Sequence, residues 1–250
     1  MSGHSKWATI KHQKGAKDQK RAKVFAKLLR QVEVAAREGG SDMSSNATLR
    51  TMYNKARDQS VPIDTIERAI KRGSGELEGV RYEAVNYEGY APNGVAVYVE
   101  TLTDNRNRTG AEMRSIFSKL GGSLAEPGAV AWQFERKGVI VLPKSVSEDD
   151  LMEVVLEAGA DDVVDDGDTW RVLCEPSSLT AVRGALEEAK IPFDSADADM
   201  QPTTSVALET AEAAKSVLRL IDALDDHDDV QNVSANFDID DSLLQQLESV

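Results

Sequence analysis

Basic side chains crowd the first thirty residues of the chain, and their types suit the binding of phosphate. Asp18 is the one acidic residue in this stretch. The cations are Lys6, Lys11, Lys14, Lys17, Lys20, Arg21, Lys23, Lys27 and Arg30. So many cations repel one another unless a polyanion neutralises them, and phosphate contacts give affinity and salt dependence without reading a sequence. We interpret the segment as a polyanion-binding arm; the alternative is a solvated face that serves solubility.

Trp7 lies among these cations. Its ring either stacks on an exposed base, a contact worth ~1–3 kcal/mol, or anchors the arm on the rest of the fold. The sequence leaves both interpretations open.

Two further groups of cations are candidates for phosphate contacts. Arg68, Lys71 and Arg72 close a predicted helix, where basic residues also complement the helix dipole. Arg106 and Arg108 lie between a predicted strand and the start of a predicted helix. The N-terminus of a helix is a common binding site for anions. In the same run, Asp104 and Asn105 also suit a structural role as turn or cap residues.

Enzyme signatures are missing from the sequence. There is no phosphate-binding Walker loop, no dinucleotide-binding glycine pattern and no histidine-based zinc spacing. Cys174 is the single cysteine and falls in a predicted strand, where it is expected to be a small core residue. The run Asp225–Asp229 is acidic and is expected to form a solvated turn rather than a cation site. We therefore expect no catalytic residues, no metal, no cofactor and no small-molecule substrate.

The net charge of −14 averages over unlike parts of the 250 residues. Residues 1–75 contain 16 Lys/Arg against 7 Asp/Glu, whereas residues 144–250 contain 6 against 27. A basic end on an acidic body favours a nucleic-acid partner bound in one orientation. With no secretory leader and no apolar run long enough for a membrane, a cytoplasmic location without a membrane partner is expected.

Hydrophobic periodicity predicts an α+β protein. Apolar stripes predict three helices over residues 16–38, 46–59 and from Pro62 to about residue 72. Strand-like runs follow at 82–88 and 95–102, then a helix at 109–120 with Thr109 as its cap, and a strand at 130–135. The stretch from 138 to 200 gives the order βαββαβ, which is complete as a ferredoxin-like unit.

One helix and one strand near the C-terminus then lack a neighbouring partner. We infer that they complete the earlier ββαβ unit, so that one α/β domain is inserted into another. The predicted domains are a basic helical domain at 1–75, a discontinuous ferredoxin-like domain at 76–137 and 206–250, and an acidic ferredoxin-like insertion at 138–205.

Several motifs resemble those of the YebC family. They are the runs Gly3–His12, Lys20–Lys23, Ile66–Gly73, Tyr87–Tyr90, Leu102–Thr109 and Asp228–Val233, with Asn236-Phe237. The resemblance spans nearly the whole chain and implies a three-domain protein without catalytic residues.

The resemblance also implies a function. Members of the family are described as cytoplasmic DNA-binding transcriptional regulators, and relatives include the mitochondrial translational activator of cytochrome oxidase. Bacterial members have also been linked to relieving ribosome stalling. The leading hypothesis is a non-enzymatic DNA-binding regulator; the alternatives are a translation factor that binds rRNA in the ribosome and a protein-interaction scaffold. The sequence does not indicate an oligomeric state.

Overall fold

The chain folds into two compact units. The structure, a computed structural model, describes residues 17–240 and residue 243, with side chains from residue 21 onward. One unit combines residues up to Phe134 with those from Pro202 onward, and the other, here called the inserted unit, spans Glu135–Gln201. Helices and antiparallel sheets occur together in the chain, so the predicted α+β class is confirmed. Within the described residues, no helix has the length and hydropathy of a membrane span.

The first unit begins with three helices, α2 (Lys17–Gly39), α3 (Ala47–Asp58) and α4 (Ile63–Gly73). Their apolar stripes meet in one core that includes Leu28, Val32, Leu49, Ile66 and Ala69. A buried carboxylate ties two of the helices together, because Glu33 of α2 accepts a hydrogen bond of 2.9 Å from Nε of Arg72 in α4.

Close contact between α2 and α4 depends on a glycine. A Cβ atom at Gly73 would lie 2.2 Å from the backbone oxygen of Glu33 and 2.8 Å from Cβ of Ala36. Both distances are shorter than van der Waals contact, so only glycine lets the helices approach this closely.

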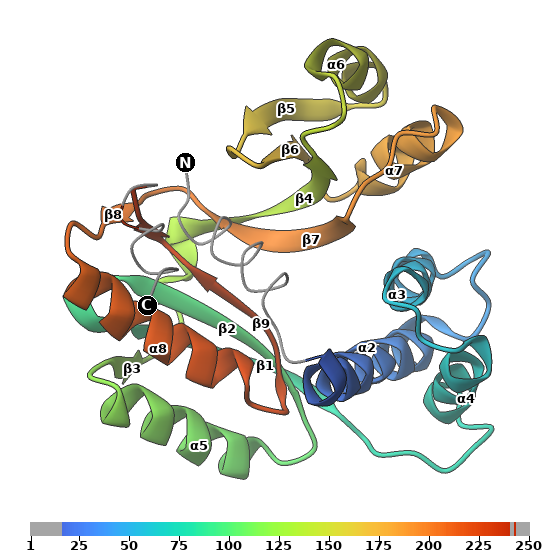
Figure 1. Ribbon diagram of the computed structural model, residues 1–250. Helices are drawn as coiled ribbons and strands as arrows, with labels where there is room; N and C mark the ends of the chain where they lie inside the picture. Colours follow the sequence, from blue (N-terminus) through green and yellow to red (C-terminus); the bar gives the residue numbers. More distant parts are fainter. Residues whose placement is uncertain (1–16, 241–242, 244–250) are drawn as a thin grey trace. The chain divides into compact units, whose positions relative to one another are not determined.

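The remainder of the first unit is a four-stranded antiparallel sheet. Its strands are β1 (Glu83–Tyr90), β2 (Ala96–Thr103), β3 (Ser123–Ala125) and β9 (Val230–Ala235), in the order β3-β1-β2-β9. Helices α5 (Arg106–Lys119) and α8 (Ala211–Asp225) cover one face of this sheet (Figure 1). A short 3₁₀ turn, η1 (Pro92–Gly94), joins β1 to β2, and two short strands, β8 (Val206–Ala207) and β10 (Phe237–Asp238), pair in parallel.

Two sequence-based predictions in this unit are wrong. Helix α5 begins at Arg106 rather than Thr109, because the Asn105 side chain accepts a hydrogen bond of 3.1 Å from the Arg108 backbone N–H and caps the helix earlier. Of the expected strand at 130–135, the middle is a 3₁₀ turn, η2 (Ala131–Gln133), and only Phe134 and Glu135 are in a strand, which belongs to the other sheet. The edge of this sheet is β3 instead.

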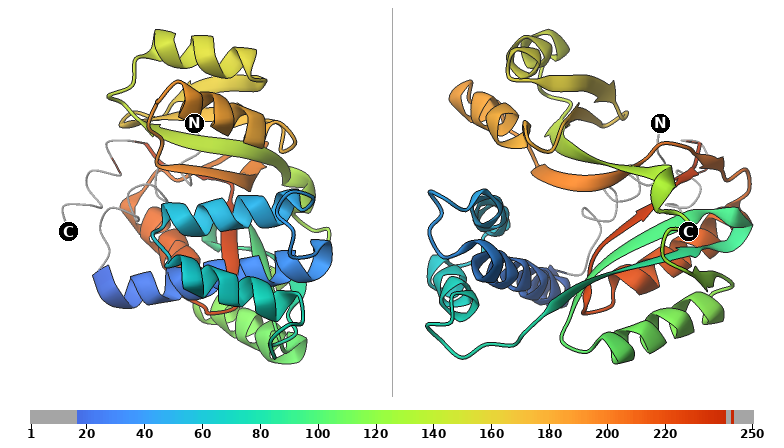
Figure 2. Two further views of the ribbon diagram at one scale, coloured as in Figure 1. Left: turned by 90° about the vertical axis from the view of Figure 1, so that its right-hand side faces the viewer. Right: turned by 180° about the vertical axis from the view of Figure 1, so that it is seen from behind.

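The inserted unit has the βαββαβ order that the sequence predicted. Its elements are β4 (Phe134–Pro143), α6 (Glu148–Glu157), β5 (Ala160–Asp165), β6 (Thr169–Cys174), α7 (Leu179–Glu188) and β7 (Ser195–Pro202). The strand order β5-β6-β4-β7 is that of a ferredoxin-like sheet, and both helices lie on one face of it (Figure 2). Burial raises the pKa of the Cys174 thiol to about 11, which fits a core residue rather than a nucleophile.

The three helices α2, α3 and α4 are called the helical part below. We expect Gly73→Ala to destabilise it by about 1–3 kcal/mol, because the added methyl group has no space between α2 and α4. Gly184→Ala is the matched control, since a Cβ at this α7 position meets no atom within 4 Å. The control is expected to gain up to ~1 kcal/mol from helix propensity. Urea unfolding followed by circular dichroism measures both changes, and equal stability of the two variants would contradict the packing argument.

Candidate functional site

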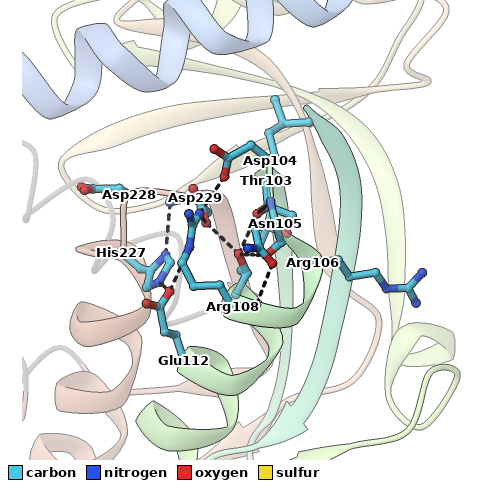
Figure 3. A network of polar contacts seen from close by, with 12 residues as sticks. Thr103, Asp104, Asn105, Arg106, Arg108, Glu112, His227, Asp228 and Asp229 are labelled. Carbon is cyan, nitrogen blue, oxygen red and sulfur yellow. Dashed lines mark hydrogen bonds and ion pairs between the residues drawn. The ribbon is translucent and has the colours of Figure 1, made fainter. Parts of the chain in front are cut away.

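A buried carboxylate lies at the centre of a network of polar contacts in the first unit. Asp229 is 4 % exposed. Its Oδ1 accepts a hydrogen bond of 3.0 Å from Nη1 of Arg30, and its Oδ2 accepts bonds of 2.6 Å from Nη2 of Arg108 and 2.7 Å from Oγ1 of Thr109 (Figure 3). One carboxylate therefore joins helix α2, helix α5 and the start of strand β9.

The junction between β2 and α5 holds two of these partners in place. The hydroxyl groups of Thr103 and Thr109 lie 2.7 Å apart, and Oγ1 of Thr103 accepts a bond of 2.9 Å from the Asn105 backbone N–H. The Asn105 cap then starts the helix so that Arg108 and Thr109 both reach Asp229. The run Asp104–Thr109 thus builds a helix start around a fixed carboxylate.

The electrostatics favour the ionised form of this acid. Burial opposes ionisation of Asp229, but the hydrogen bonds from Thr109 and Arg108 outweigh it and hold the pKa below its usual 3.8. The bond to Asp229 in turn raises the pKa of the Arg108 guanidinium. The pair is therefore charged across the physiological pH range.

A stripe of three cations on α2, formed by Lys23, Lys27 and Arg30, binds the acidic turn at residues 225–229. Lys27 donates to the backbone oxygen of Asp225 at 2.6 Å, and Lys23 donates to that of Asp226 at 3.0 Å. These are the last carbonyl groups of α8, whose own final turn contains no basic residue. Cations complement the negative end of a helix dipole, so two lysines that lie 198 and 203 residues away along the chain cap α8.

Arg30 completes this stripe. Its Nη1 also donates to the backbone oxygens of Leu102 at 2.8 Å and Asp228 at 3.0 Å, and its guanidinium lies 4.7 Å from the centre of the Tyr82 ring. Lys23, Arg30 and residues 226–229 of the acidic turn line a polar cavity of about 510 Å³, to which Arg108 also contributes.

Three side chains in this cavity have the types and spacing of metal ligands. Ligand atoms of Glu112, His227 and Asp229 lie within 4.8 Å of one another. However, Nδ1 of His227 accepts the Asp229 backbone N–H at 3.1 Å, so its Nε2 donates to Glu112 at 2.8 Å in the neutral ring. Because Arg30 and Arg108 already occupy the Asp229 oxygens, this group is better suited to hydrogen bonding than to holding a divalent cation.

The structure places the candidate nucleic-acid-binding residues in three environments. Lys23, Lys27, Arg30, Arg72 and Arg108 pair with carboxylates or carbonyl groups of the protein. Arg21, Arg68, Lys71 and Arg106 are exposed without a side-chain bond to a distant segment of the described residues, whereas Lys23 and Arg108 of the paired group are about half-exposed. Lys6, Trp7, Lys11 and Lys14 lie outside the described residues, and Lys17 and Lys20 belong to α2 with undescribed side chains.

Arg106 and Arg108 have different surroundings although they lie two residues apart. Arg108 points into the network around Asp229, whereas Arg106 points away from it (Figure 3). Arg108 is therefore engaged by the protein, while Arg106 is presented on the surface at the start of α5.

Sequence reasoning missed the central acid. The sequence pattern predicts a solvated turn for Asp229, yet this residue accepts hydrogen bonds from two arginines. The available signal was the pairing of an arginine-containing helix start with a distant acidic turn, and nothing in the local pattern connects the two.

Fold and site together define an α+β protein whose basic helical part is bound to an acidic turn by arginine–carboxylate bonds. Residues 5–76 match the TACO1/YebC protein N-terminal domain family, and residues 82–237 match the family of the TACO1/YebC second and third domain. The chain therefore belongs to the TACO1/YebC family.

Individual relatives agree over their full length. The chain is 53 % identical to a probable transcriptional regulatory protein of Geobacter sulfurreducens, covering 99 % of this chain and 100 % of the relative. It is 52 % identical to one of Streptomyces coelicolor, with 100 % of both chains covered. Among solved structures, a conserved hypothetical protein of Aquifex aeolicus has a TM-score of 0.83 at 45 % identity, covering 91 % of this chain and 95 % of that one.

We expect Asp229→Asn to lower the free energy of unfolding by about 2 kcal/mol at pH 7, because two guanidinium groups lose their charged acceptor. The contribution of Asp229 is complete above its unfolded pKa of 3.8 and declines as the pH falls through the lower folded pKa. The gap between variant and wild type should therefore narrow in acid.

Asp228→Asn is the matched control, since its side chain is 79 % exposed and makes only a surface ion pair. It should leave stability unchanged at both pH values. Urea titrations at pH 7 and pH 3 measure the free energy of unfolding of each variant relative to wild type. A difference for Asp229→Asn that stays constant with pH would argue against stabilisation by an ionised Asp229.

Proposed function

We propose that the protein is a non-enzymatic, nucleic-acid-binding regulator of gene expression, and that its helical part provides the main contact surface. The single observation that carries the proposal is the concentration of cations in residues 1–75, where 16 Lys/Arg face 7 Asp/Glu. The names of its relatives, probable transcriptional regulatory proteins, support a regulatory role.

The exposed cations are the better candidates for phosphate contacts. Arg21, Arg68 and Lys71 are exposed on α2 and α4, and Arg106 is exposed at the start of α5. Arg68 pairs with Asp64 at 3.7 Å, but both side chains are 68 % exposed, and such surface pairs are weak enough for phosphate to replace. The stripe of Lys23, Lys27 and Arg30 instead positions α2 on the acidic turn, so it contributes to binding indirectly.

The placement of charge on α4 favours contacts to the backbone of a nucleic acid. A recognition helix usually reads bases with its N-terminal residues, which here are Ile63, Asp64 and Thr65. An acidic residue in that first turn is poorly suited to the phosphate-lined major groove, while the basic residues lie at the opposite end of the helix. RNA recognised by shape and stacking fits this arrangement as well as DNA does, which makes an rRNA-binding translation factor the second candidate.

We expect the triple change Arg21→Gln, Arg68→Gln and Lys71→Gln to lower the slope of log Kd against log salt by about 2 to 3, since each lost phosphate contact removes ~0.7–0.9. Lys119→Gln, Lys215→Gln and Arg219→Gln remove the same charge from exposed positions of α5 and α8 and form the control. Anisotropy titrations with a labelled single-stranded RNA and a labelled DNA duplex give the slopes.

Equal slopes for the two triple variants would refute the helical part as the contact surface. Absence of binding to either probe would refute the nucleic-acid function and favour a protein-interaction scaffold. Pelleting of the full chain with purified ribosomes, tested at low and moderate salt, separates the two regulators: co-sedimentation at moderate salt supports the translation factor, and its absence together with duplex binding supports the DNA regulator.

A further inference from the structure

Trp132 is the most exposed large apolar side chain in the described part of the chain. It lies in η2 and is 70 % exposed. Tryptophan is highly buried on average, so an indole left in water at a fixed place calls for an explanation. The surroundings of the ring show how it is held there.

A buried acid builds the turn that carries this ring. The carboxylate of Glu88, which is 6 % exposed, accepts backbone N–H bonds from Gly128 and Val130 at 2.7 Å and from Ala131 at 2.8 Å. Burial opposes ionisation of Glu88, but these three donors prevail and lower its pKa. A charged carboxylate that accepts three amides fixes the backbone immediately before Trp132.

The turn is also anchored on its other side. Val130 and Phe134 are buried, while Trp132 between them points outward. The Gln133 backbone oxygen accepts a bond of 2.8 Å from the Thr203 N–H, and Oε1 of Gln133 accepts one of 3.0 Å from Asn236. Hydrogen bonds therefore fix the backbone on both sides of Trp132, at residues 128–131 and at Gln133.

The indole itself is oriented by a hydrogen bond. Its Nε1–H donates to the Ala129 backbone oxygen at 3.1 Å, and the Tyr90 hydroxyl donates to the same oxygen at 3.3 Å. Because its polar group is satisfied within the protein, Trp132 offers a partner only its aromatic surface.

The isolation of the ring indicates what kind of partner it fits. The other exposed large apolar side chains in the described residues lie in the helical part with its following linker (Ile63, Leu77, Val80) and in α6 (Met152, Leu156). A protein interface needs a contiguous apolar core, which a single ring does not provide. Base stacking needs only one flat, accessible ring and tolerates any base, since every base has a π-face.

We propose that Trp132 is a stacking platform for an unpaired nucleobase. This inference rests on the proposed nucleic-acid function and narrows it to partners that contain single-stranded segments. Bases inside a duplex are already stacked on both faces, so a rigid ring on the protein surface selects unpaired ones. Cations of the helical part supply the phosphate contacts, and Trp132 supplies the preference for single strands.

The test uses the full chain with Trp7→Phe, so that emission reports only Trp132 and the buried Trp170. Unlabelled twelve-residue oligouridylate should quench the exposed tryptophan, and a duplex of equal length should not. Trp132→Ala should weaken single-strand binding about tenfold, equivalent to ~1.4 kcal/mol, and leave duplex binding unchanged. Trp132→Phe keeps an aromatic ring and should retain more affinity than Trp132→Leu, which keeps only apolar surface.

Each outcome separates this inference from the proposal on which it rests. Binding of single strands without quenching, or with equal affinity for the alanine and wild-type side chains, overturns the stacking platform and leaves the nucleic-acid function intact. Equal affinities of the phenylalanine and leucine variants show that the ring acts through apolar area and also overturn stacking. If the wild-type chain, with Trp7 in place, binds no nucleic acid, the proposed function fails first. Melting temperature is the folding control, because an exposed ring should contribute little to stability.

Discussion

The first unit depends on the hydrogen bonds that the buried Asp229 carboxylate accepts. It accepts hydrogen bonds from Arg30 of α2 and from Arg108 and Thr109 of α5, so segments from three distant parts of the chain meet at one buried charge. A buried acid with fewer hydrogen-bond donors would resist ionisation, and the two arginines would then lose their charged acceptor. The Asn105 cap and the Thr103–Thr109 contact serve to present those donors in the right geometry. The neighbouring lysines then cap α8 with charge that α8 itself lacks.

Two groups of cations occur in the helical part, those bonded to the acidic turn and those exposed on the surface. Lys23, Lys27 and Arg30 lie on one stripe of α2 and hold it on the acidic turn. The cations Arg21, Arg68 and Lys71 of α2 and α4 remain exposed on the surface. The strongly acidic turn therefore has a structural purpose inside a protein that we propose binds nucleic acid, since it fixes the basic helix rather than repelling it. Glu88 plays a comparable part at η2, where a buried carboxylate fixes a turn and its exposed tryptophan.

Local patterns in the sequence predicted most of the elements, whereas the site depended on contacts that no local pattern contains. The apolar stripe of α2 and the βαββαβ order of the inserted unit follow from periodicity, and both are confirmed. The partners of Asp229 lie 121 and 199 residues away, so the charge pairing was invisible along the chain. The alternation around Trp132 resembles a strand, but Glu88, some forty residues earlier, takes the backbone N–H groups that a strand would use. Tertiary hydrogen bonds overrode the local preference in both places.

The division of the cations is tested most directly by the Nε–Hε resonances of the arginines during titration with single-stranded RNA. The account predicts that the signals of Arg21 and Arg68 shift as RNA is added, while those of Arg30 and Arg108 stay in place because Asp229 retains them. Shifts confined to Arg30 and Arg108 would contradict it, since they would mean that RNA displaces Asp229 and binds the two arginines that this acid holds.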